Sequence, residues 1–583
     1  MRGSFKLIGC AIVALIAHLS ASAQTGVITG RVVTEDGAGA PNVPVTLSAV
    51  TSEPRATTGV RQEQAVTDED GNFKFTGLAP RVYNLGVFGA KGYVSQPLTA
   101  SERSRGRYYR AGDHVTITLI RGGVITGKVT TSTGEPMIGV QVSVVMVKDF
   151  EGNPVMQQFG GRARSTDDRG VYRLYGLPPG TYVVLTRGNL SSSPISPHDG
   201  YTSTYHPSSP RETAAEVTVA SGGEAVGVDI RFRGERGHTV SGVVTGGGEL
   251  AQPLVGVSVT LINASTGFFA GSGFVREGEG QNGFAISGVA DGEYEIIARR
   301  TGTGDFARMA SPPRRVTVKG ADAGGIELRL APLASISGKV IVENSPNACE
   351  SKRKSSLEET FVSARRDTRA ASAASQPTFF QSDGSVNDKG EFTIYNLDPS
   401  RYYIAAQLPN ENWYVKSITA VVPAAPTRGN STAAKPAASA DVARNGLAVK
   451  SGDKLTGLTV TIADGAASLS GRIVAAKEGA RLSVRLRLHL IPAEAGSADE
   501  VARYAEAMAR SDGAFALSNI APGKYWLVAR PAPDDEPGDR PWPIAWDANE
   551  RAKLRKEAEA MKMEVELKPC QRVTDQLVKY SGK

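Results

Sequence analysis

Two aromatic residues ten positions apart recur five times along this chain, at long and similar intervals. A short turn sequence stands between the members of each pair, such as Gly-Leu-Pro-Pro-Gly at residues 176–180. A spacing that repeats in this way indicates that one structural module has been duplicated. We therefore expect an array of five small domains. The pairs are Phe73 and Tyr83, Tyr172 and Tyr182, Phe284 and Tyr294, Phe392 and Tyr402, and Phe515 and Tyr525.

Alternating apolar residues surround each aromatic pair. Every copy opens with such a run around a glycine, as in Ile-Thr-Gly-Lys-Val at residues 125–129. A second run follows, as at Val140, Val142 and Val144, and a third closes the copy. Period-two alternation is typical of half-buried strands. About seven short strands with turn signals between them predict an antiparallel sandwich for each copy.

The predicted fold class is therefore all-β, with five tandem transthyretin-like or immunoglobulin-like sandwiches. Each strand has one apolar face, so a core forms only when two sheets close on each other. The recurring tyrosine is then expected to be a core residue whose hydroxyl caps a loop, as in a tyrosine corner. The predicted boundaries are a signal peptide at 1–23, sandwiches at 26–120, 123–234, 238–332, 335–465 and 468–569, and a tail at 570–583.

The last two copies carry insertions. Residues 350–376 are polar, and residues 423–443 are rich in Ala, Ser, Thr and Pro, so both are expected to be mobile loops. In the fifth copy, residues 497–500 form a capping box that predicts a helix continuing to Met508. Asp547 is expected to cap a second short helix. The linkers between copies are short, which predicts a semi-rigid rod.

The first residues indicate export. Arg2 and Lys6 precede an apolar stretch at 7–19, and a small-residue cleavage site ends at Ala23, before Gln24. This pattern is typical of a secretory signal peptide. We expect a secreted, periplasmic or cell-surface protein after cleavage near Ala23 and Gln24. The chain has 66 basic and 59 acidic residues, and their interspersion argues against nucleic-acid binding.

The motifs together resemble the carboxypeptidase regulatory-like family of bacterial secreted proteins, and they are similar to the Cna B-type and carbohydrate-binding-like sandwich folds. The resemblance spans about residues 26–569 and implies a transthyretin-like sandwich in each copy. Copies three and four depart from the pattern, with Asp291 in place of proline and Ser400 in place of glycine. The motifs specify a fold and do not specify an activity. The second copy matches most fully, at Gly127, Val129, Gly134, Pro136, Ile138, Gly139, Val140, Thr166, Asp167, Gly170, Tyr172, Leu174, Leu177, Pro179, Gly180 and Tyr182.

The sequence lacks the usual signatures of a hydrolase. A carboxypeptidase zinc site needs a His-x-x-Glu pair and a distant histidine, and no histidine after the signal peptide has Glu three residues on. Asp68 and Asp70 resemble the start of a calcium loop, but Ala79 stands where such a loop needs Glu, so a hairpin turn is favoured. We predict no catalytic residue, no metal site and no cofactor.

Two cysteines remain after signal-peptide cleavage, Cys349 and Cys570. An even pair in an oxidising compartment predicts a disulfide. This bond would tie the insertion of the fourth copy to the chain beyond the last predicted strand.

All four tryptophans lie late in the chain. Trp542 and Trp546 are the candidates for stacking on a sugar ring, whereas Trp526 follows a core tyrosine and should face an inserted helix. The leading hypothesis is a non-enzymatic scaffold, adhesion or binding protein of the cell envelope. The second is a carbohydrate-binding protein using the aromatics of the fifth domain, and the third is a hydrolase of unrecognised type. The expected partners are a polysaccharide or a cell-envelope protein.

Overall fold

The computed structural model describes residues 26–50, 62–87, 90, 92–98, 108–155, 163–186, 200–246, 256–275, 282–300, 309–343, 346, 348–350, 356–367, 383–408, 410–422, 438–476, 482, 485–533 and 542–580. The predicted signal peptide lies outside these residues. Within them the fold is all-β apart from two α-helices and short 3₁₀ turns, as the sequence predicts. No helix of the described part is long and apolar enough to cross a membrane.

The first repeat forms two four-stranded sheets, with strand orders β4-β1-β8-β6 and β3-β2-β5-β7. The first strand, β1, pairs in parallel with the closing strand β8 and antiparallel with the aromatic strand β4. The same arrangement of opening, aromatic and closing strands returns in the later repeats. The bounds are β1 Gly26–Thr34, β2 Pro44–Ala49, β3 Glu63–Val66, β4 Asn72–Leu78, β5 Val82–Val87, β6 Tyr93–Ser95, β7 Tyr109–Arg110 and β8 His114–Arg121.

The second repeat has two sheets, and the third joins its two sheets into one. In the third, the two-residue strand β23 pairs with both β22 and β25, so eight strands form a continuous sheet that folds over the core. The bounds in the second repeat are β9 Gly123–Thr130, β10 Gln141–Asp149, β11 Arg164–Ser165, β12 Val171–Leu177, β13 Gly180–Thr186, β14 Thr204–Tyr205, η1 Arg211–Thr213, β15 Glu216–Val219, β16 Glu224–Ala225 and β17 Ile230–Arg231. Those in the third are β18 His238–Gly246, β19 Val257–Asn263, β20 Phe269–Phe274, β21 Gly283–Val289, β22 Gly292–Arg300, β23 Met309–Ala310, β24 Arg314–Val318 and β25 Ala323–Pro332.

The last two repeats again have two sheets each. In the fourth the orders are β29-β26-β34-β31-β32 and β28-β27-β30-β33, and in the fifth β38-β35-β41 and β37-β36-β39-β40. The bounds in the fourth are β26 Ala334–Glu343, η3 Leu357–Glu359, β27 Phe361–Arg366, β28 Asp383–Ser385, β29 Glu391–Leu397, β30 Ser400–Gln407, β31 Trp413–Val422, β32 Ala438–Asp441, α2 Val442–Asn445, β33 Leu447–Val449 and β34 Lys454–Asp464. Those in the fifth are β35 Ala467–Ala475, β36 Leu486–Pro492, η5 Ala495–Ser497, η6 Val501–Arg503, β37 Ala505–Met508, β38 Ala514–Ile520, β39 Gly523–Pro531, η7 Ile544–Trp546, α3 Ala548–Met561, β40 Glu564–Leu567 and β41 Arg572–Tyr580.

Each repeat encloses its own large apolar core among the described residues. The recurring tyrosine lies in that core in every copy, and its hydroxyl donates to the carbonyl oxygen four residues before it. In the second copy, Tyr182 is 3% exposed and its hydroxyl lies 2.5 Å from the Pro178 oxygen. Burial raises the pKa of Tyr294 to about 12, so the hydroxyl stays a donor at neutral pH. The other bonds are Tyr83 to Ala79, Tyr294 to Ala290, Tyr402 to Asp398 and Tyr525 to Ala521.

The repeat glycine of the opening strand has a packing reason. A Cβ placed on Gly127 would lie 2.0 Å from the carbonyl oxygen of Val228 on the closing segment and 3.0 Å from the hydroxyl of Tyr172. The Tyr172 hydroxyl itself donates to that Val228 oxygen. Only a residue without a side chain lets the opening strand, closing strand and first aromatic approach so closely.

Replacing Gly127 with alanine should therefore lower the free energy of unfolding of the second sandwich by about 1–3 kcal/mol. The added methyl group meets backbone, which cannot rotate away. Chemical denaturation followed by near-ultraviolet circular dichroism measures this change. Gly496→Ala, in the fifth sandwich, is the control for removing a glycine, because nothing lies within 4 Å of its added Cβ and its backbone is outside the left-handed region. Equal destabilisation by both variants would contradict the packing explanation.

The structure corrects the predicted insertions. Residues 350–376 contain η3 and the core strand β27, so that segment is only partly a loop. Residues 438–443, placed in the loop ending at 443, form β32 and the start of α2. The helix predicted from the capping box at 497–500 is wrong: the 3₁₀ turn η6 and the strand β37 stand there, because the chain completes a sheet beside β36. The helix capped by Asp547 is confirmed, since its carboxylate accepts from the Asn549 and Glu550 amides.

The closing strand of the fifth sandwich was misplaced. The run at Met563, Val565 and Leu567 is β40, which pairs with β39, whereas the strand parallel to β35 is β41, inside the predicted tail. Its alternation is broken by Asp575, which has a φ of 59° and produces a bulge in the ladder. Glycines hold the corresponding positive-φ position in other copies, as at Gly325 and Gly457.

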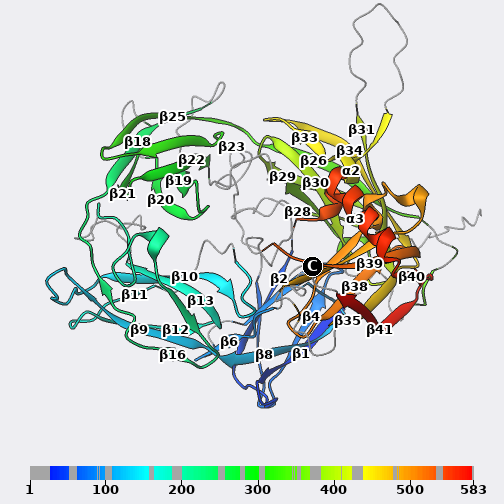
Figure 1. Ribbon diagram of the computed structural model, residues 1–583, viewed down its shortest axis with the longest axis horizontal. Helices are drawn as coiled ribbons and strands as arrows, with labels where there is room; N and C mark the ends of the chain where they lie inside the picture. The colour runs from blue at the N-terminus through cyan, green and yellow to red at the C-terminus, as the bar shows by residue number, and fades with distance from the viewer. Residues whose placement is uncertain are drawn as a thin grey trace, which may run out of the picture.

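The chain turns back on itself in place of the predicted rod (Figure 1). The first sandwich contacts the fourth, where the rings of Tyr108 and Phe361 lie 4.6 Å apart and Arg110 lies 3.9 Å from Glu359. The second contacts the fifth, where the Arg485 guanidinium donates to the Asn153 side chain at 3.0 Å. We call this arrangement, in which Tyr108 and Arg110 contact the fourth sandwich and Asn153 contacts the fifth, the closed circuit. The short linkers restrict the motion of neighbouring sandwiches. The contacts between sandwiches that are far apart in sequence set the direction in which the array bends.

Candidate functional site

The most elaborate contact between domains joins the fourth and fifth sandwiches. Residues 542–547, which we call the strap, leave the fifth sandwich before α3 and pack on the fourth. Trp546 stacks on Tyr403 of β30 with ring centroids 4.8 Å apart, and Trp542 meets both rings edge to face. The guanidinium of Arg365, on β27, lies 5.0 Å from the Trp542 ring. Three aromatic rings and one cation thus form a packed cluster.

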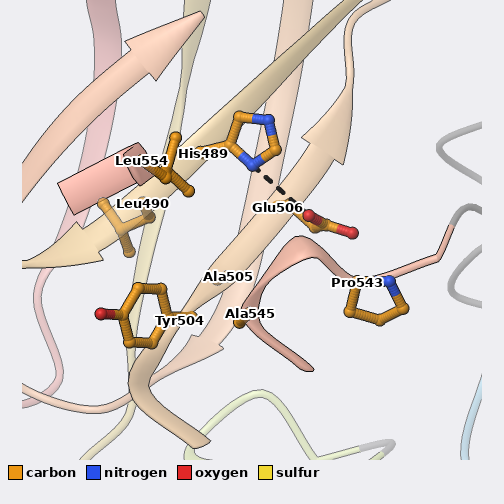
Figure 2. Close-up of a pocket in the computed structure, with 8 residues that line it drawn as sticks. All are labelled: His489, Leu490, Tyr504, Ala505, Glu506, Pro543, Ala545 and Leu554. Atoms are coloured by element: carbon orange, nitrogen blue, oxygen red, sulfur yellow. Dashed lines mark ion pairs between the residues drawn. The ribbon is translucent and has the colours of Figure 1, made fainter. Parts of the chain in front are cut away.

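Polar side chains of the fifth sandwich anchor the strap from beneath. Arg487 and His489 on β36 are 3% and 2% exposed, and Glu506 on β37 lies against both. The Glu506 carboxylate is 3.4 Å from His489 Nδ1, the ion pair marked in Figure 2. It is 3.7 Å from the Arg487 guanidinium. It also accepts from the Ile544 amide at 3.4 Å, while Arg487 donates to the Trp542 carbonyl oxygen at 3.3 Å.

The charge of Glu506 is stabilised in spite of its position. Burial opposes ionisation, but the hydrogen bond from His489 and the charge of Arg487 outweigh it and lower the pKa of Glu506 below its usual value. The carboxylate therefore remains ionised at neutral pH and offsets the buried guanidinium. The pair serves the strap, whose backbone both groups hold.

A small cavity lies beside this pair, with a volume of about 30 Å³, which is room for one or two water molecules. No serine, cysteine, threonine or lysine lines it, so it offers no side chain that would act as a nucleophile beside His489. The Tyr504 hydroxyl is committed to the Ala498 carbonyl oxygen at 2.7 Å. The arrangement can hold water and the strap, and it is too small for a peptide or a sugar. The lining residues are His489, Leu490, Tyr504, Ala505, Glu506, Pro543, Ala545 and Leu554 (Figure 2).

The two tryptophans proposed for glycan stacking belong to the aromatic cluster. Trp542 and Trp546 are half-buried, and their rings face each other, Tyr403 and Arg365. A sugar would need the ring face that these neighbours take. Trp526 faces α3 as expected, with the Arg555 guanidinium 5.1 Å from its ring.

The two cysteines are joined in the structure. Cys349 and Cys570 form a disulfide with Cα atoms 5.5 Å apart, and it connects the fourth sandwich to the turn before β41. The expected cross-link peptide remains a prediction for mass spectrometry of the unreduced protein, which should find no free thiol.

The Asp68 motif forms a turn. The Asp68 carboxylate accepts from the amides of Asp70 and Asn72, at 3.0 and 2.7 Å, and these bonds, the one from the Asn72 amide foremost, lower the pKa of Asp68. Asp167 makes the same contacts with the Arg169 and Val171 amides. Among the described residues, no group of three or more His, Cys, Asp or Glu side chains is placed to hold a metal ion.

Sequence reasoning missed the strap and its anchors. Arg487 and His489 sit in an otherwise apolar strand, Leu486–Pro492, and all seven of its residues are buried. Buried polar residues on the strand face opposite the core residues Leu486, Leu488 and Leu490 are a signal that both faces are covered. That signal was available, but their partner Glu506 lay in a segment assigned to a helix.

Comparison with known proteins gives a family for the first repeat. Residues 27–109 match the model of the carboxypeptidase regulatory-like domain. No curated protein matches the sequence. The chain is also similar, at low identity, to several solved structures. The Bacillus anthracis TIE protein is 13% identical, with 52% of this chain and 50% of that chain covered and a TM-score of 0.13. The chain therefore spans about half the length of that protein.

Two pilins show a similar level of likeness. The minor pilin GBS52 from Streptococcus agalactiae is 13% identical, with 36% of this chain and 95% of that chain covered and a TM-score of 0.20. The shaft pilin spaA from Lactobacillus rhamnosus GG is 13% identical, with 36% and 98% covered and a TM-score of 0.16. The family match covers the first sandwich except its closing strand β8, and the aromatic pair and strand order of that sandwich recur along the chain. The first repeat is thus similar to the carboxypeptidase regulatory-like domain, and the later repeats share its aromatic pair and strand order.

Proposed function

We propose that this protein is a secreted, non-enzymatic scaffold of the cell envelope, in which five sandwiches act as one rigid unit. The domain boundaries predicted above, with the fifth extended to Tyr580, are part of this proposal. A unit of this kind presents loops of several domains in fixed positions to a polysaccharide or protein partner.

The closed circuit carries the proposal. Contacts between sandwiches that are not neighbours in sequence remove the independent motion expected of beads on a string. The Arg485 and Asn153 side chains are 8% and 5% exposed, so their hydrogen bond is shielded from water. Arg299 and Asp398 add a 2.6 Å ion pair between the third and fourth sandwiches, with both side chains mostly buried.

The ionisable side chains at the strap, Arg487, His489 and Glu506, support a structural role for the protein. The buried set at the strap is engaged with the backbone that it anchors, and the cavity beside it has room for water only. The aromatic rings of the strap are engaged with one another. These two observations favour the scaffold over the hydrolase and the sugar-stacking hypotheses.

The test combines binding with an activity assay. Purified mature protein should sediment with isolated cell envelopes of the producing organism, and it should hydrolyse no C-terminal peptide substrate with or without added zinc. The matched control is the Arg110→Ala, Arg485→Ala variant, which removes one side chain from each long-range contact and should bind more weakly. Peptidase turnover that a chelator abolishes would overturn the proposal, as would an absence of envelope binding.

A further inference from the structure

The closing strand of the fifth sandwich is held more weakly than those of the first and fourth sandwiches. Of the nine residues of β41, only Val578 is buried, and Leu577 is 59% exposed. Within the described part of the chain, β41 pairs with β35 alone and stands at the edge of a three-stranded sheet. The bulge at Asp575 further interrupts its ladder.

In the first and fourth sandwiches the closing strand has four buried side chains and two neighbours. The closing strand β8 pairs with β1 and β6, and β34 pairs with β26 and β31. Burial of apolar surface is what holds an edge strand in place, since its outer backbone groups bind only water. The buried residues are Val115, Ile117, Leu119 and Ile120 in β8, and Leu458, Val460, Ile462 and Ala463 in β34.

The disulfide lies at the start of this weak strand. Cys570 lies two residues before β41 begins, and its amide donates to the Gly465 carbonyl oxygen at 3.1 Å. Cys349 approaches from the fourth sandwich, and its amide donates to the Asp464 carboxylate at 2.9 Å. Residues 464–466, which we call the joint, connect β34 to β35. Both cysteines thus meet at the joint, on opposite sides of the domain boundary.

We propose that the Cys349–Cys570 bond is a redox-sensitive latch that keeps β41 paired with β35. When the bond is intact, the turn that precedes β41 is fixed to the fourth sandwich. Its reduction leaves one buried side chain and one interrupted ladder, so β41 separates and leaves β35 as a free edge while the other sandwiches stay folded. This inference goes beyond the scaffold function and does not depend on envelope binding.

The chemistry is thiol–disulfide exchange with a dithiol reductant. A thiolate of the reductant attacks one sulfur of the bond, forming a mixed disulfide and releasing the other cysteine as a thiolate. The second thiol of the reductant, as a thiolate, then displaces the remaining cysteine and closes an oxidised ring. Two electrons pass to the protein, and the two cysteines take up the two protons that the dithiol loses. Access is open, because Cys570 is exposed and Cys349 is half-buried.

Hydrogen exchange followed by mass spectrometry tests the latch on the full mature protein. The probe is dithiothreitol added to the folded, oxidised protein. Amides in β35 and β41 should exchange at least about 10-fold faster after reduction, because strand opening no longer works against a cross-link. Amides of β9 and β12 in the second sandwich are the internal reference and should not change.

The Cys349→Ser, Cys570→Ser variant is the matched control. It should show the fast exchange without reductant and gain nothing when reductant is added. If this variant does not fold, the reduced wild-type protein still gives the answer. Unchanged exchange in β41 after complete reduction would overturn the proposal. Loss of protection throughout the fifth sandwich would also overturn it, because the bond would then hold the whole domain and not one strand.

Discussion

Replacing Tyr182 with alanine is expected to lower the free energy of unfolding of the second sandwich by about 3–5 kcal/mol, while the other sandwiches remain folded. The side chain is 3% exposed and packs in the core with Val142 and Leu174, so its removal leaves a cavity. The loss of its bond to Pro178 adds to the cost. Differential scanning calorimetry of the mature protein should show one transition moving to lower temperature.

Tyr182→Phe separates the two contributions. This variant keeps the ring and removes the hydroxyl, so the free energy of unfolding should fall by about 1 kcal/mol. The loss is larger if water does not reach the Pro178 oxygen that is left unpaired. Equal effects of Phe and Ala would mean that the hydroxyl bond, and not the packing of the ring, supports the turn. A Tyr182→Ala protein as stable as the wild type would remove the tyrosine corner from the explanation of the fold.

Replacing Glu506 with alanine should destabilise the fifth sandwich by about 3–5 kcal/mol. The Arg487 guanidinium would remain 3% exposed with its nearest carboxylate gone. The strap would also lose the acceptor of the Ile544 amide, so Trp546 should become mobile. Denaturation monitored by tryptophan fluorescence reports both changes, because the ring environment of Trp546 changes with the strap.

The pH dependence has a definite sign. The pKa of Glu506 is lower in the folded protein than its ordinary value of 4.5, so its stabilising contribution is complete above that value. The contribution is lost as the pH falls below 4.5 through the folded pKa. Glu506→Gln removes this titration and keeps a group that can accept a hydrogen bond. The stability of the variant should therefore depend less on pH between about 5 and 3 than that of the wild type. Parallel pH profiles would contradict this assignment.

The repeats made the sandwich fold predictable from the sequence. Phe73 and Tyr83 repeat with fixed spacing because one strand and one turn separate them, and that local geometry is written in adjacent residues. Gly127 is explained only by what lies across the sheet, yet its recurrence made it visible without the structure. Local, repeated features could therefore be predicted with the residues in hand.

Contacts that depend on one copy could not be predicted in this way. The strap uses Trp542 and Trp546, which occur in the fifth copy alone, and its partners Tyr403 and Arg365 lie in another domain. Asp575 concealed β41, because an aspartate at positive φ replaces a glycine and breaks the alternation. The orientation of the domains depends on pairs such as Asn153 and Arg485. Nothing in the sequence around either residue indicates that the two are in contact.

The contact between Asn153 and Arg485 also sets the order in which the molecule can be completed. The two residues are 332 positions apart, so the second sandwich must wait for almost the whole chain before this contact forms. Each sandwich can fold from its own local contacts as it emerges, whereas the bend of the array is a late event. A chain that stops short of Arg485 would hold folded domains without that contact. The overall shape of the array is therefore completed only after the individual sandwiches have folded.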